Sequence, residues 1–60
     1  MKVINGKEVD YEIRPLQVEF YHRDDGVCGQ IRLPMDFDPS KHDMEKWILN
    51  MYAKGAYEHL

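Results

Sequence analysis

Hydrophobic and polar residues alternate through most of the first half of this chain, and this alternation constrains the fold more than any other feature. From Glu8 the sequence reads EVDYEIR, which puts Val9, Tyr11 and Ile13 on one side of an extended backbone and the charged residues on the other. Successive side chains of a β-strand point to opposite faces of the sheet. The segment is therefore predicted to be a strand with one buried face.

Pro15 marks the point at which the alternation changes parity. After it, the hydrophobic positions are Leu16, Val18 and Phe20. Proline has no backbone N–H and restricts the residue before it, here Arg14. The Arg14-Pro15 step is therefore either a bend between two strands or a bulge in one long edge strand, and the sequence leaves both open.

Two glycine-containing pairs predict hairpin turns. Asn5-Gly6 indicates a first hairpin, and a bulged three-residue turn there puts Val3 and Val9 on one face. Within HRDDGVCGQIRLP, Asp25-Gly26 is typical of a two-residue type I′ turn. The cross-strand pairs that this second turn predicts are Phe20 with Ile31, Val18 with Leu33 and Glu19 with Arg32.

The C-terminal third has the period of an α-helix with one buried side. Its hydrophobic positions are Met44, Trp47, Ile48, Met51 and Tyr52, and we expect Trp47 to be the most buried. Asp38 before Pro39 suits a helix start, with Ser40-x-x-Asp43 as an alternative capping box. Lys54-Gly55 predicts the helix end.

Together these patterns predict an α+β fold: a small antiparallel β-meander of three to four strands with one C-terminal α-helix packed across one face. The whole chain, residues 1–60, is one domain. The expected strands span about 1–4, 8–14, 16–23 and 27–33, and the expected helix about 39–54. The tail from Ala56 to Leu60 is expected to fray or to change direction.

Composition narrows the classes of function. A chain of 60 residues with 43% hydrophobic and 32% charged residues is too hydrophobic for a disordered segment. Its net charge of −3 disfavours binding to nucleic acid through phosphate neutralisation. The single Cys28 cannot form an internal disulfide, and no signal peptide or membrane-spanning run is evident, so we expect a cytoplasmic protein.

No group of polar residues has the spacing of a metal or catalytic site. The candidate ligands His22, Cys28, His42 and His59 include no pair at the usual ligand spacing. His22 and Cys28 are expected on opposite faces of the hairpin, and the aspartates Asp36, Asp38 and Asp43 suit helix capping. We therefore expect no metal, no cofactor, no small-molecule substrate and no enzymatic activity.

Two surfaces are candidates for binding a partner. On the helix, Leu49 and Ala53 lie away from the buried stripe and form a narrow hydrophobic seam. On the outer face of the sheet, an acidic strand adjoins an aromatic position. The residues concerned are Glu8, Asp10, Glu12 and Tyr21. A sheet covered on one side also keeps two open edges, which pair readily with foreign strands.

The sequence thus predicts a small cytoplasmic, non-enzymatic protein-binding module. Its compact acidic character suits an inhibitor or regulator of the kind that phages and mobile elements encode, which occludes a partner protein. One alternative is a structural or assembly subunit that acts as a homo-oligomer. Another is a nucleic-acid-binding sheet, which the net charge of −3 opposes. No motif places the chain in a known family.

Overall fold

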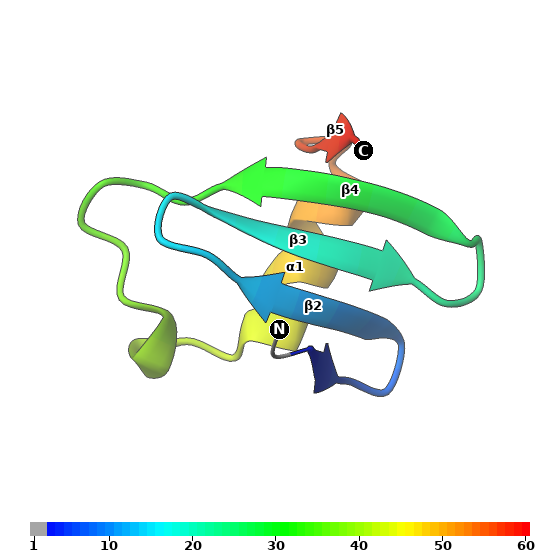
Figure 1. The fold of residues 1–60 in the computed structure, drawn as a ribbon, viewed down its shortest axis with the longest axis horizontal. Helices are drawn as coiled ribbons and strands as arrows, with labels where there is room; N and C mark the ends of the chain where they lie inside the picture. Colours follow the sequence, from blue (N-terminus) through cyan, green and yellow to red (C-terminus); the bar gives the residue numbers. More distant parts are fainter. Residues whose placement is uncertain (1–2) are drawn as a thin grey trace.

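A computed structural model describes residues 3–60, and within them one antiparallel sheet is covered by one α-helix. The strands are β1 (Ile4–Asn5), β2 (Val9–Ile13), β3 (Gln17–His22), β4 (Val27–Arg32) and β5 (Glu58–His59), in chain order across the sheet (Figure 1). A 3₁₀ helix, η1 (Pro39–Lys41), precedes α1 (Met44–Ala53). The predicted meander with a C-terminal helix is confirmed, with one strand more than expected. The start of the predicted first strand, residues 1–2, lies outside the described residues.

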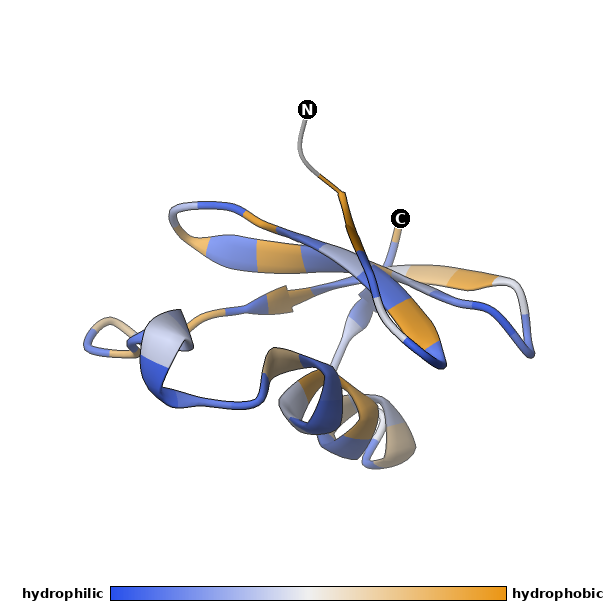
Figure 2. Cartoon of the chain, turned by 90° about the horizontal axis from the view of Figure 1, so that it is seen from below, coloured by the Kyte–Doolittle hydropathy of each residue, from blue (hydrophilic) through white to orange (hydrophobic). Residues whose placement is uncertain are grey.

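The hydrophobic core fills the space between the sheet and α1. Figure 2 shows the two layers from the side, with α1 beneath the sheet. The buried residues are Val9, Val18, Phe20, Ile31, Met44 and Ile48. Both the strand alternation and the helical stripe therefore face the core, as predicted.

The register of the β3–β4 hairpin differs from the prediction. Val18 pairs with Ile31, and Phe20 pairs with Gly29, so β4 is displaced by two residues along β3. A type I′ turn needs positive φ at both central residues. Gly26 has a φ of 68°, but the φ of Asp25 is not positive. The chain instead forms a wider loop, residues 23–26. The predicted pairs Phe20–Ile31, Val18–Leu33 and Glu19–Arg32 are therefore wrong. A shift of two residues keeps each side chain on its predicted face.

Gly29 explains why this register is stable. A Cβ atom at Gly29 would lie 2.7 Å from the ring of Phe20 and 2.8 Å from that of Tyr57. The Phe20 ring therefore lies directly over the glycine and meets Tyr57 edge-on, with ring centroids 5.4 Å apart. The packing of one aromatic ring across a bare backbone position selects the partner of Phe20.

The β1–β2 hairpin also departs from the prediction. Ile4 pairs with Tyr11, so Val3 lies on the face opposite Val9 rather than on the same face. The turn is held by α1: the carboxylate of Glu45 accepts a hydrogen bond from the Glu8 N–H at 2.7 Å. This carboxylate lies so close to Gly6 that a side chain there would collide with it. A contact from a distant segment, rather than local turn preference, sets this pairing.

The Arg14-Pro15 step is a turn between two separate strands, which settles the alternative left open above. The Arg14 N–H donates to the Gln17 carbonyl at 2.8 Å and closes the turn. The strand predicted from residue 16 begins at Gln17 instead. Leu16 is consequently 73% exposed within the turn.

The predicted helix 39–54 is divided into two helices. Asp38 caps η1 by accepting from the Ser40 N–H at 3.0 Å, and Asp43 caps α1 by accepting from the Lys46 N–H at 3.3 Å. Each aspartate thus starts its own helix. His42 between them is extended, with φ −129° and ψ 151°, so the helix cannot run through.

The most buried residue of α1 is Ile48, at 0% exposure, and not Trp47 as predicted. Trp47 is only partly buried, because it lies at the side of the core and packs against Phe37, with ring centroids 4.9 Å apart. The ridge of α1 that points straight at the sheet is formed by Ile48 and Met44.

The predicted glycine cap is confirmed and leads into β5. Gly55 has a φ of 72°. Its N–H donates to the Tyr52 carbonyl, and the Ala56 N–H donates to the Met51 carbonyl at 2.9 Å, which is the Schellman pattern. The tail then runs back along the sheet and pairs with β4, so it changes direction rather than frays.

Candidate protein-binding surface

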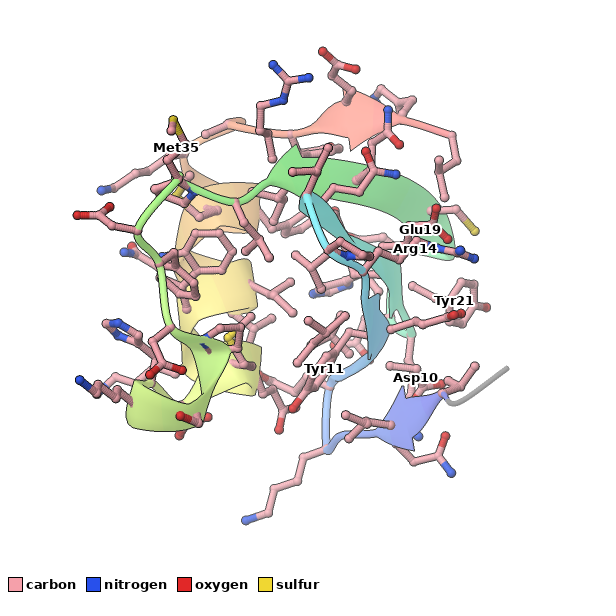
Figure 3. All side chains as sticks on the ribbon, turned by 60° about the vertical axis from the view of Figure 1, so that its left-hand side comes forward. Asp10, Tyr11, Arg14, Glu19, Tyr21 and Met35 are labelled. Atoms are coloured by element: carbon pink, nitrogen blue, oxygen red, sulfur yellow. The ribbon has the colours of Figure 1, made fainter. Side chains whose placement is uncertain are left out.

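The face of the sheet turned away from α1 carries most of the predicted sheet-face residues. Figure 3 shows Asp10, Glu19 and Tyr21 on this side, whereas Tyr11 points toward the helix. In the strand register Asp10 lies opposite Tyr21, and Tyr21 lies opposite Cys28. We call this side of the sheet the outer face.

Hydrophobic side chains from distant parts of the chain meet on the outer face. Val3 is 54% exposed, Tyr21 42% and Leu60 65%, and together with Cys28 they line one shallow hollow of about 200 Å³. Leu60 is held there because its N–H donates to the Cys28 carbonyl at 3.1 Å. Figure 2 shows the C-terminus on the side of the sheet opposite α1. We call these four residues the outer patch.

Carboxylates border the outer patch, and arginines at the strand ends neutralise them. The Arg23 guanidinium donates to Asp10 at 2.6 Å, a hydrogen bond that raises the pKa of Arg23 above its ordinary value. Arg14 lies 3.2 Å from Glu19 and 3.5 Å from Glu12. The predicted acidic strand is therefore a set of ion pairs around an apolar centre.

The structure brings Asp10, Glu12 and Tyr21 together but separates Glu8 from them. Glu8 lies in the β1–β2 turn and, with Leu49, lines a different groove beside α1. Asp10, Glu12 and Tyr21 all line the hollow of the outer patch. Of the predicted sheet residues, three thus belong to one surface.

The helix seam expected from Leu49 and Ala53 is not continuous. Leu49 is partly buried and packs against the core, because α1 contacts β2 and turns this side toward the β1–β2 turn. Ala53 remains exposed. The helix ends at Ala53, so the seam does not continue beyond this residue.

Three members of the outer patch, Val3, Cys28 and Leu60, were not among the predicted binding residues. The assumed turn put Val3 on the wrong face, and the assumed register kept Cys28 away from Tyr21. Leu60 carries no local signal, since its position depends on the pairing of β5 with β4.

A cluster of polar aromatic residues joins the β3–β4 loop to α1. The His22 ring stacks on the Tyr52 ring with centroids 4.5 Å apart, and His22 Nδ1 lies 3.6 Å from the Asp25 carboxylate. The Tyr52 hydroxyl donates to the same carboxylate, which raises the pKa of Tyr52 to about 12. Cys28 projects from the other face of the hairpin, so it does not meet His22. The cluster connects the sheet to α1.

Within residues 3–60 the side chains form no group of three or more His, Cys, Asp or Glu arranged to hold a metal ion. No helix in this described part is both long and apolar enough to cross a membrane. Comparison of the chain with protein-family models, with curated proteins and with solved structures finds no match.

Proposed function

We propose that this chain is a small, non-enzymatic protein-binding module that places its outer face on a partner protein and occludes the surface it covers. The observation that carries this proposal is the outer patch. Val3 and Leu60, which flank the two edge strands, and side chains from the centre of the sheet line one exposed, largely apolar hollow. A central aromatic and aliphatic patch within a polar rim is the usual anatomy of a protein interface.

The ion pairs at the rim support this use of the surface. Asp10 and Glu19 already have arginine partners, so binding of a partner does not desolvate an unpaired charge at these positions. Rim pairs of this kind contribute to orientation and choice of partner more than to affinity. The affinity then comes from Tyr21 and its apolar neighbours, because buried aromatic anchors dominate binding energies.

The hollow favours a partner that presents a hydrophobic side chain as its anchor. Its volume of about 200 Å³ suits one or two side chains rather than a large ligand. Cys28, which lies between Tyr21 and Leu60, is exposed and unpaired, and a reducing compartment would keep its thiol in that state. A cytoplasmic location is therefore part of the proposal.

The proposal is tested by capture from extracts of the source organism on the immobilised protein, with two matched charge substitutions. We expect Tyr21→Asp to abolish capture of the specific partner and Ala53→Asp, on the exposed side of α1, to leave it intact. Both variants should keep the wild-type far-UV circular dichroism. Capture that survives Tyr21→Asp would refute the role of the outer face.

Two other outcomes would favour one of the two alternative functions, a homo-oligomeric subunit or a nucleic-acid-binding sheet. A mass that doubles on concentration, and that Tyr21→Asp returns to monomer, would indicate a homo-oligomeric subunit. Capture that disappears after nuclease treatment or at high salt would indicate nucleic acid.

A further inference from the structure

The C-terminal end of β4, Ile31 and Arg32, has no strand of residues 3–60 beside it on the β5 side. β5 pairs only with Gly29 and Gln30, and Figure 1 shows no strand beside the arrowhead of β4 on that side. The Leu33 N–H donates to the Leu16 carbonyl of the β2–β3 turn, whereas the Leu60 N–H reaches the Cys28 carbonyl from the β5 side. Even-numbered residues of β4 therefore direct their backbone groups toward β5.

Continuation of this pairing is blocked by the cap of α1. Ile31 and Tyr57 would be the next pair in the β4–β5 register, and the next pair joined by backbone hydrogen bonds would be Arg32 and Ala56. The Ala56 N–H is instead donated to the Met51 carbonyl at 2.9 Å. Ala56 therefore belongs to the cap of α1 and does not pair with β4. The N–H and the carbonyl of Arg32 have no strand of the described chain opposite them on this side.

A large hollow of about 530 Å³ lies along this free edge. Its walls come from both faces of β4, with hydrophobic residues on the helix side and polar residues on the outer side. They include Ile31, Met51 and Tyr57 on the helix side and Gln30 and Arg32 on the outer side. The hollow is wide enough to receive an added backbone segment and one of its side chains.

Arg32 differs in charge pairing from Arg14 and Arg23. Those two arginines contact carboxylates, whereas the exposed guanidinium of Arg32 is in no ion pair with any residue between 3 and 60. The nearby Glu58 carboxylate accepts a hydrogen bond from the Gln30 amide at 3.2 Å. Arg32 thus offers a free positive charge next to free backbone groups.

We propose that this edge binds an extended acidic peptide segment of a partner protein as an additional short strand beside Arg32. The peptide backbone would pair with the N–H and carbonyl of Arg32, and a carboxylate on the outer side would pair with its guanidinium. The next side chain of the peptide points to the opposite face, toward Met51 and Tyr57, and is therefore hydrophobic. This surface is separate from the outer patch, so the inference stands independently of the proposed function.

The test uses a nine-residue peptide in which glutamate alternates with valine, and a control peptide in which lysine replaces each glutamate. The peptides are titrated into the ¹⁵N-labelled full chain and followed by NMR. We expect the acidic peptide to shift the amides of Gln30, Arg32 and Glu58 and to slow hydrogen exchange at Arg32. We expect Arg32→Gln to weaken binding about tenfold, because a charge-assisted hydrogen bond is lost. The matched variant Lys41→Gln, which removes an exposed positive charge on η1, should bind as the wild type does.

Three results of the peptide titrations would overturn the inference. They are equal binding of the lysine peptide, unchanged affinity in Arg32→Gln, and the absence of shifts at these amides with millimolar acidic peptide. A shift of the Arg32 amide on concentration of the protein alone would also overturn it, because a second copy would then occupy the edge. A folded Arg32→Gln variant is expected, since this side chain is exposed.

Discussion

A methyl group added at Gly29 tests whether aromatic packing sets the register of the central hairpin. The new Cβ of Gly29→Ala would lie 2.7 Å from two atoms of the Phe20 ring and 2.8 Å from Tyr57. Phe20 is 3% exposed, and its ring meets both Tyr52 and Tyr57 edge-on, so it has little room to move. Overpacking of this kind costs about 1–3 kcal/mol.

The net loss of stability is smaller than this cost. Alanine loses less backbone entropy than glycine on folding, which stabilises the folded state by about 0.4–1 kcal/mol. We therefore expect Gly29→Ala to lower the free energy of unfolding by about 1–2 kcal/mol. For a domain of 60 residues, each kcal/mol corresponds to a fall in Tm of about 4–8 °C. Thermal and urea unfolding, followed by circular dichroism, measure both quantities.

A double-mutant cycle distinguishes the clash from a general loss of strand stability. The smaller side chain of Phe20→Leu makes room, so Gly29→Ala should cost less in the Phe20→Leu background than in the wild type, with a coupling of about 0.5–1 kcal/mol or more. Gly26→Ala is the control for backbone strain: a Cβ there meets nothing within 4 Å, but φ is 68°. An equal or higher Tm in Gly29→Ala, or an equal cost in both backgrounds, would refute the reasoning.

The remaining predictions concern α1. Ile48→Ala should lower the free energy of unfolding by about 2–5 kcal/mol. The loss should exceed that of Trp47→Ala, because Ile48 is fully buried and Trp47 lies at the core margin. Urea unfolding that gives the reverse order would contradict this prediction. The hydrogen bond to Asp25 raises the pKa of Tyr52 from 10.0 to about 12, so the folded state keeps a proton that the unfolded state loses. The stability from this bond should be intact below pH 10 and fall between about pH 10 and 12, and Tyr52→Phe should remove that pH dependence. A tyrosine absorbance titration with every residue ionising near pH 10 would count against it.

Much of this architecture is determined locally. The alternation around Val9 and Tyr11 and the helical period through Ile48 specify which side chains are buried, and burial is the largest favourable term in folding. Gly26 and Gly55 have positive φ where the turn and cap patterns required it. These features depend on residues a few positions apart, so the sequence carries them directly.

Strand pairing was decided by tertiary contacts. Gly29 lies beneath the Phe20 ring, and Tyr57, from beyond the helix, packs on the same ring. The β1–β2 turn is held by Glu45, 37 residues away from Glu8. The β3–β4 pairing is shifted from the predicted one by two residues, which buries the same face, so the alternation alone does not choose between the two registers.

The candidate surfaces depend on tertiary structure even more strongly. Asp10, Glu12 and Tyr21 follow from strand parity, but the outer patch also needs Val3 and Leu60, which the pairing of β1 and β5 brings to the sheet. The sequence by itself determined the strands, the helix and their buried sides. Only the tertiary structure decided which strands adjoin and which exposed side chains meet, because those energies come from neighbours far apart in the chain.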